Sequence, residues 1–197
     1  RCPHARAGVG AVSTQNITDP NLGTLILDHM ETGKDAKTAI DLVVKGRENI
    51  NFRQLTAIDK YGNTSHFTGS NILGTNAVSE KSNCIAAGNL LSNLGVADAM
   101  ADGFNSDNNL HLAERLLIGL ESGLKAGGEA GPVHSAALIV VDQTKFPLVD
   151  LRVDWEEEDA VPKLRMLWSA YEPQMLDYLN RALNPAVAPS YGVAGDL

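Results

Sequence analysis

The first third of the chain carries two successive runs with the apolar spacing of an amphipathic helix. In the first run, the apolar residues Leu22, Leu25, Ile26 and Met30 fall on one face. Asp19 followed by Pro20 is typical of a helix start, and Gly33 is typical of a helix end. The second run begins at Asp35 and ends at Gly46. The pattern therefore predicts a helical hairpin.

Extended segments stand before and after this hairpin. Residues 8–13 are small and β-compatible, which predicts a buried strand. Residues 52–59 alternate, and turn residues separate them from Thr64–Thr68, which predicts an antiparallel hairpin. Residues 84–90 predict a further strand. The intervening residues 69–82, rich in Ser, Asn and Gly, predict a long exposed loop.

The second half repeats this alternation of helical and extended patterns. Helices are predicted over Val96–Phe104 and residues 110–125. The continuously apolar residues 135–141 predict a central strand covered on both faces, and residues 148–153 alternate as a second strand. A long helix is predicted over residues 162–183, with a kink at Pro173.

Pairs of helices alternate with strands that are joined by tight turns, and this order favours an α+β fold with antiparallel sheet over a doubly wound parallel sheet. No repeat or linker divides the chain. We therefore predict one domain over residues 1–184, followed by a tail over residues 185–197.

Composition excludes several classes of function. The 197 residues carry a net charge of −8, which argues against unspecific binding to nucleic acid. The longest apolar run, residues 136–141, is far shorter than the roughly 18 to 20 residues that span a bilayer. We expect a cytoplasmic protein that binds neither nucleic acid nor membrane.

Cysteine and histidine spacing gives no support for a metal site or a cofactor. Cys2 and Cys84 stand far apart, outside any C-x-x-C pair, and the five histidines never form an H-x-x-x-H or H-x-H pair. We therefore predict neither metal nor cofactor, and a site that uses these residues must be assembled from distant segments.

Polar residues at predicted strand ends are candidates for binding a small molecule. Thr14 and Gln15 follow the first strand, where they line a pocket or only hydrogen-bond the next turn. Asn89 closes the strand after the predicted loop, where its amide either donates to a developing oxyanion or holds a neighbouring loop.

Two further candidate groups come from the second half. Glu129 and His134 flank a glycine-rich loop beside the predicted central strand, so a carboxylate and an imidazole can meet at one end of the sheet. Asp150, Arg152 and Asp154 share one strand face, which indicates either an exposed ion-paired surface or an organised site with Arg152 binding substrate.

Several stretches together resemble one bacterial family. They are residues 5–15 (ARAGVGAVSTQ), 113–117 (AERLL), 126–128 (AGG), 135–141 (SAALIVV) and 150–154 (DLRVD). The chain resembles, over residues 1–167, the uncharacterised domain of unknown function 1028, a family grouped with the Ntn hydrolases. The resemblance implies a four-layer αββα sandwich of two antiparallel sheets between helix layers, and amide-bond hydrolysis.

The resemblance also raises a question about the nucleophile. Ntn enzymes attack with the side chain of an N-terminal Thr, Ser or Cys and use its own α-amine as base. Residue 1 here is Arg1, and relatives carry about two more strands ahead of this position. Either the nucleophile precedes this sequence, or removal of Arg1 exposes Cys2 as the nucleophile.

Two functions follow as hypotheses. The first is an Ntn-type hydrolase of a small amide or amino-acid derivative, with Cys2, Asn89 and His134 as catalytic candidates and with a binding set of Thr14, Gln15, Glu129 and Arg152. The second is a protein of the same fold that binds a small molecule, or assembles, without catalysis. The aromatic spacing of the C-terminal helix (Trp168, Tyr171, Met175, Tyr178) fits homo-oligomerisation or an internal core.

Overall fold

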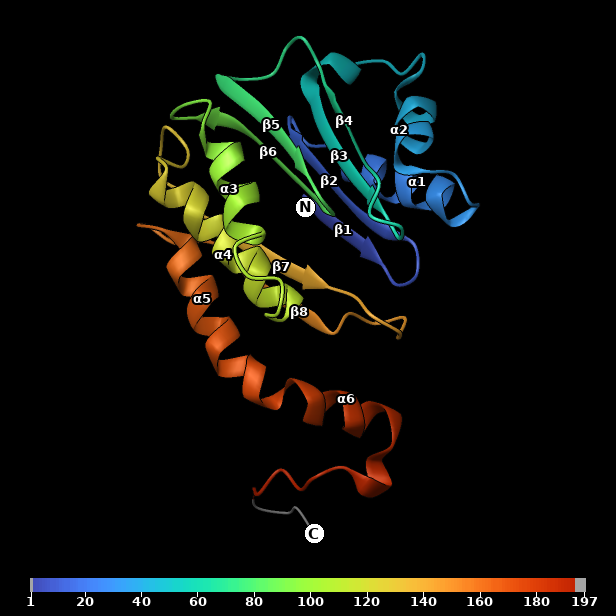
Figure 1. Cartoon of the computed structure of the whole chain (residues 1–197), viewed down its shortest axis with the longest axis vertical. Helices are drawn as coiled ribbons and strands as arrows, with labels where there is room; N and C mark the ends of the chain where they lie inside the picture. The colour runs from blue at the N-terminus through green and yellow to red at the C-terminus, as the bar shows by residue number, and fades with distance from the viewer. Residues whose placement is uncertain (1, 194–197) are drawn as a thin grey trace.

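The computed structural model describes residues 2–193 and has the mixed α+β architecture that the sequence predicts (Figure 1). Every strand pairing is antiparallel. Within the described residues the strands form one four-stranded sheet and two separate two-stranded sheets, where the family resemblance implies two sheets.

The four-stranded sheet is a meander of β1 (Pro3–Arg6), β2 (Gly10–Asn16), β3 (Arg53–Asp59) and β4 (Thr64–Thr68). Strand β1 is not predicted from the sequence because it has only four residues, begins with a proline and contains no β-branched or aromatic residue. A tight turn joins β1 to β2, and Gly10 is the first residue of β2 after it. Its φ is +151°, and a Cβ on it would lie 2.2 Å from the carbonyl oxygen of Ile58. The glycine is therefore required for the close pairing of β2 and β3.

Helices α1 (Pro20–Glu31) and α2 (Ala36–Val44) cover one face of this sheet, as the hairpin prediction requires. Asp19 and Asp35 cap them by accepting hydrogen bonds from the N–H groups of Asn21 and Thr38. The apolar stripe packs onto the sheet, and the fully buried side chains of this core include Leu22, Ile26, Ile40 and Leu55.

A hairpin of β5 (Thr75–Lys81) and β6 (Cys84–Leu91) lies against the other face of the four-stranded sheet. The prediction of a long exposed loop over residues 69–82 is therefore wrong, because β5 occupies its second half. The strand was missed because both of its faces carry polar residues: Ser79 donates to Asp98 of α3 (Val96–Phe104), and Glu80 faces the four-stranded sheet.

Helix α3 and helix α4 (Leu112–Lys125) pack on the far side of the β5–β6 hairpin (Figure 1). Strand β7 (Ala136–Val140) pairs with β8 (Val149–Val153) alone within the described residues, so the expected central strand has one hydrogen-bonded neighbour. Leu138, Val140 and Val149 are buried in a core with α4 and the next helix.

The predicted C-terminal helix is divided in two, as Pro173 indicates. Helix α5 (Ala160–Tyr171) ends at a 3₁₀ turn over Glu172–Gln174, and α6 (Met175–Leu183) follows. Trp168 and Met175 are buried within the chain, which agrees with the internal-core interpretation for these two side chains. A 3₁₀ turn (Pro185–Val187) and irregular backbone follow to residue 193, and the last four residues of the predicted tail lie outside the described residues. No helix in the described part of the chain is long and apolar enough to cross a membrane.

Candidate functional site

The face of the four-stranded sheet that lies against the β5–β6 hairpin is polar. Side chains alternate along each strand, and Leu55 and Ala57 of β3 pack against α1 and α2. Gln54 and Thr56 therefore point to the opposite face, toward the hairpin. Cross-strand pairing places Gln15 beside Gln54 on that face.

Three amide side chains meet between the sheets and form what we call the inter-sheet amide cluster (Gln15, Gln54 and Asn89). The Oε1 atom of Gln54 accepts a 2.8 Å hydrogen bond from Nε2 of Gln15. It also accepts a 3.4 Å hydrogen bond from Nδ2 of Asn89 on β6. Strand β2 of one sheet and strand β6 of the other thus each supply a donor to one buried acceptor. Gln15 and Asn89 are predicted from the sequence as separate candidates.

The cluster holds an unused donor. Gln54 is 0% exposed, and its Nε2 atom has no hydrogen-bond partner. The Oγ1 atom of Thr68, which stands opposite Gln54 on β4, is also buried without a partner. Because buried polar groups nearly always have partners, these two adjacent atoms form a place where a bound water molecule or a ligand can supply the missing hydrogen bonds.

The backbone is unusual directly after two members of the cluster. Leu90, which follows Asn89, has φ of +53°, and Asn16, which follows Gln15, has φ of +67°. Asn tolerates this left-handed region, whereas Leu is rarely found there. Leu90 lies within β6, where the pairing with β5 is irregular, and Asn16 is the last residue of β2. Such backbone conformations concentrate at functional sites.

A second polar group lies on the same inner face. Glu80 of β5 accepts a 2.6 Å hydrogen bond from the Thr64 hydroxyl, and its other oxygen lies 2.6 Å from Nδ1 of His66. The hydrogen bond from Thr64, supported by His66, keeps the pKa of the Glu80 carboxyl below its usual value. This group is not predicted from the sequence because its residues come from β4 and from β5, and the pattern of β5 indicates a loop.

Two other predicted residues, Thr14 and Cys2, lie on the opposite side of the sheet. Thr14 is fully buried, and its hydroxyl donates to the carbonyl oxygen of Asp19 at the start of α1. The carbonyl oxygen of Cys2 accepts the N–H of Thr14, so Cys2 continues the ladder of β1. By strand alternation its side chain shares a face with that of His4, which contacts α1 at Gly23. Both residues therefore face away from the inter-sheet amide cluster.

Glu129 and His134 each have a separate environment. Glu129 forms a β-bridge with Leu91 at the end of β6, and burial raises the pKa of its carboxyl. The Nδ1 atom of His134 lies 2.6 Å from the carbonyl oxygen of Glu156, and its ring stacks on Trp155. Neither side chain has a hydrogen bond to the other or to the inter-sheet amide cluster within the described residues.

Arg152 lies on the exposed face of β8. It pairs with Asp154 at 3.1 Å, and the two side chains are 68% and 77% exposed. This agrees with the ion-paired surface that the sequence offered as one of its two interpretations of the stripe. Arg152 is not joined to the other predicted site residues.

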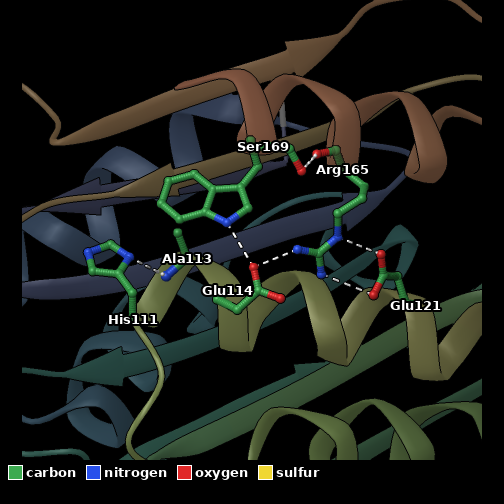
Figure 2. Close-up of polar contacts among 7 residues, drawn as sticks. His111, Ala113, Glu114, Glu121, Arg165 and Ser169 are labelled. Atoms are coloured by element: carbon green, nitrogen blue, oxygen red, sulfur yellow. Dashed lines mark hydrogen bonds and ion pairs between the residues drawn. The ribbon is translucent and has the colours of Figure 1, made fainter. Parts of the chain in front are cut away.

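Two partly buried ion pairs join helix α5 to helix α4 (Figure 2). We call this group the α4–α5 clamp (Glu114, Glu121, Arg165 and Trp168). Arg165 of α5 donates to Glu114 at 2.5 Å and to both oxygens of Glu121, and the indole N–H of Trp168 donates to Glu114 at 2.8 Å. These carboxylates raise the pKa of the Arg165 guanidinium. The donors of Arg165 and Trp168 bind the two glutamate carboxylates within the cluster. We therefore assign the α4–α5 clamp a structural role.

A cavity in the described part of the chain lies away from the inter-sheet amide cluster. It has a volume of about 380 Å³ and lies between the loop before β8 and helices α5 and α6, lined by apolar groups such as Phe146, Leu148 and Met175. No group of three His, Cys, Asp or Glu side chains within residues 2–193 is arranged to hold a metal ion. Both cysteines are free thiols, and burial raises the pKa of Cys84.

Comparison with known proteins identifies relatives without an assigned activity. The model of a family described as "Family of unknown function (DUF1028)" matches residues 1–164. A crystal structure of protein SPO2555 from Silicibacter pomeroyi, assigned to the same family model, is similar with a TM-score of 0.81 and 27% sequence identity. The similarity covers 90% of this chain and 76% of that one. No match was found among curated proteins.

Proposed function

Because the chain belongs to DUF1028, a family of unknown function, we propose a function from its own structure: it binds a small, uncharged amide at the inter-sheet amide cluster and hydrolyses it. The observation that supports this proposal most strongly is the buried, unpartnered Nε2 atom of Gln54, which lies where Gln15 and Asn89 converge.

The chemistry of the cluster favours an amide as ligand. The free N–H of Gln54 requires an acceptor, and the unpartnered hydroxyl of Thr68 can accept a hydrogen bond from a donor. An amide group supplies both, through its carbonyl oxygen and its N–H. The cluster contains no charged side chain, whereas a carboxylate ligand in a buried place needs a cation beside it. We therefore propose an uncharged substrate.

We also propose that the layers correspond to the four-layer αββα sandwich of Ntn-type hydrolases, with the β5–β6 and β7–β8 pairs acting as one layer. The position of α1 and α2 on one side and of α3 and α4 on the other supports this arrangement. The proposal assigns no nucleophilic role to Cys2, because its side chain faces α1.

The second candidate function is binding of the same amide without turnover. It is favoured by one observation: the members of the inter-sheet amide cluster are neutral, and none can act as a base at neutral pH. Turnover of a bound amide separates the two functions.

The proposal is tested by calorimetric titration with a matched pair of ligands. N-acetylalaninamide is uncharged, and N-acetylalanine differs from it by a carboxylate. We expect the amide to bind more tightly. Gln54→Met keeps the length of the side chain and removes its donor, and we expect it to weaken amide binding by about tenfold, the value of one buried hydrogen bond.

The control is Gln143→Met, in the exposed loop between β7 and β8, which we expect to bind like the wild type. Thermal unfolding of both variants shows whether they are folded. Equal binding by wild type and a folded Gln54→Met protein would overturn the proposal.

A further inference from the structure

The group formed by Thr64, His66 and Glu80 lies one step along the strands from the inter-sheet amide cluster. Thr68 stands opposite Gln54, and His66 stands opposite Thr56. His66 is therefore the diagonal neighbour of Gln54 on the same face of the sheet. Diagonal neighbours in antiparallel sheet lie about 7–8 Å apart. The side chains of Gln54 and His66 are therefore close enough to act on the same bound group.

Glu80 orients the imidazole. Its Oε1 atom lies 2.6 Å from Nδ1 of His66, and its Oε2 atom is fixed by the hydroxyl of Thr64, also at 2.6 Å. A carboxylate can only accept a hydrogen bond, so Nδ1 carries a proton in this contact. In the neutral ring the other nitrogen, Nε2, is then the basic one. His66 and Glu80 are 42% and 38% exposed, so water reaches them.

We propose that His66 and Glu80 form the proton-transfer pair of the hydrolytic site, with His66 as general base and Glu80 as its positioning residue. This assignment rests on the proposed function. Gln54 donates to the carbonyl oxygen of the amide, and Asn89 and Gln15 hold Gln54 in place.

The reaction needs only water as co-reactant. Nε2 of His66 takes a proton from water while the water oxygen bonds to the amide carbon, and the electron pair of the C=O bond moves to the oxygen that Gln54 binds. His66 then returns the proton to the amide nitrogen, the C–N bond breaks with its electron pair going to nitrogen, and the C=O bond re-forms. The products are a carboxylic acid and an amine.

The same contacts join β4 to β5, so catalysis must be separated from a purely structural role. We would measure hydrolysis of N-acetylalaninamide by the full chain, by His66→Ala and by Glu80→Gln. General-base catalysis contributes about 10²–10⁴-fold, so we expect His66→Ala to lower kcat by at least about 100-fold with KM nearly unchanged. Glu80→Gln should lower kcat by a smaller factor.

Two controls make the result specific. Added imidazole should restore part of the kcat of His66→Ala, because it replaces the missing base and cannot replace a structural contact. His29→Gln, on α1 at the other side of the sheet, should have the activity of the wild type.

Each outcome has one meaning. Loss of kcat with rescue by imidazole supports the pair. If the wild type hydrolyses the amide and His66→Ala has the same kcat, the assignment of His66 and Glu80 is overturned and the proposed function stands. The same holds if His66→Ala lowers kcat and added imidazole does not restore it. Binding of the amide without turnover by the wild type overturns the pair and hydrolysis together, and retains the binding function. No binding overturns both proposals.

Discussion

A buried amide normally has partners for all of its polar atoms, and Gln54 departs from this rule. Its oxygen accepts two hydrogen bonds, while its nitrogen donates none. Leaving a buried donor without a partner costs about 1–3 kcal/mol. A chain that needed only a stable sheet interior would be served better by an apolar residue here, so the unused donor favours a binding role.

The contacts of Glu80 predict how the stability of the fold changes at acid pH. Its carboxyl has a lowered pKa in the folded protein, so its ionised form stabilises the fold above the ordinary value of 4.5, and this contribution is lost as the pH falls through the lower, folded value. We expect the wild type to lose stability relative to Glu80→Gln below about pH 4.5. The difference should be roughly 0.2–1 kcal/mol, because the contact is partly exposed.

Thermal unfolding between pH 3 and pH 6 measures this difference. Glu48→Gln, at an exposed turn, is the control. A constant difference between wild type and Glu80→Gln across this range would contradict the contact between Glu80, Thr64 and His66.

Sequence reasoning at the residue scale located part of the candidate site. Gln15 and Asn89 were identified as polar residues at strand ends, and both belong to the inter-sheet amide cluster. Gln54 is not among the predicted site residues because the alternation of residues 52–59 does not show what covers the polar face of that strand. Gln54 is buried because the β5–β6 hairpin packs against its face of the four-stranded sheet. That contact joins segments far apart in the chain, so no local pattern predicts it.

At the scale of elements, the ion pairs of Arg165 and Arg152 allow the stabilising effects of a partly buried and an exposed arginine to be compared. Arg165 in the α4–α5 clamp is 25% exposed and binds two carboxylates, whereas Arg152 is 68% exposed and binds one. Arg165→Met should lower the free energy of unfolding by about 1–3 kcal/mol, because Glu114 and Glu121 lose a shared partner. Arg152→Met should lower it by less than about 0.5 kcal/mol.

Chemical denaturation of the two variants provides the measurement. Similar losses in the two variants would show that the α4–α5 clamp does not hold α5 on the body. Figure 2 shows why we expect a difference, since Arg165 lies between the two carboxylates of α4.

Helices were predicted better than strands because their signals are local. The caps at Asp19 and Asp35 and the bounds of Val96–Phe104 agree with the structure. Strand β5 was missed because Ser79 and Glu80 make polar contacts on both of its faces, which removes the alternation that marks a strand. The apolar run before residue 141 indicated burial correctly, but burial of β7 comes from helices and not from two neighbouring strands.

At the scale of the whole molecule, the fold brings two predicted residues together and separates the others. The four-stranded sheet divides the candidates, with Thr14 and Cys2 on the side of α1 and the inter-sheet amide cluster on the side of the β5–β6 hairpin. Glu129, His134 and Arg152 have their own local partners. We therefore place the proposed chemistry between the four-stranded sheet and the β5–β6 hairpin.

The most direct test is to observe the side-chain amide groups of the full chain by ¹⁵N–¹H NMR during titration with N-acetylalaninamide. The account predicts that the NH₂ signals of Gln54, Gln15 and Asn89 shift together and saturate, while that of the exposed Gln143 stays in place. Saturable binding that leaves the Gln54 signal unchanged, or no binding at all, would contradict the central claim that this cluster is an amide-binding site.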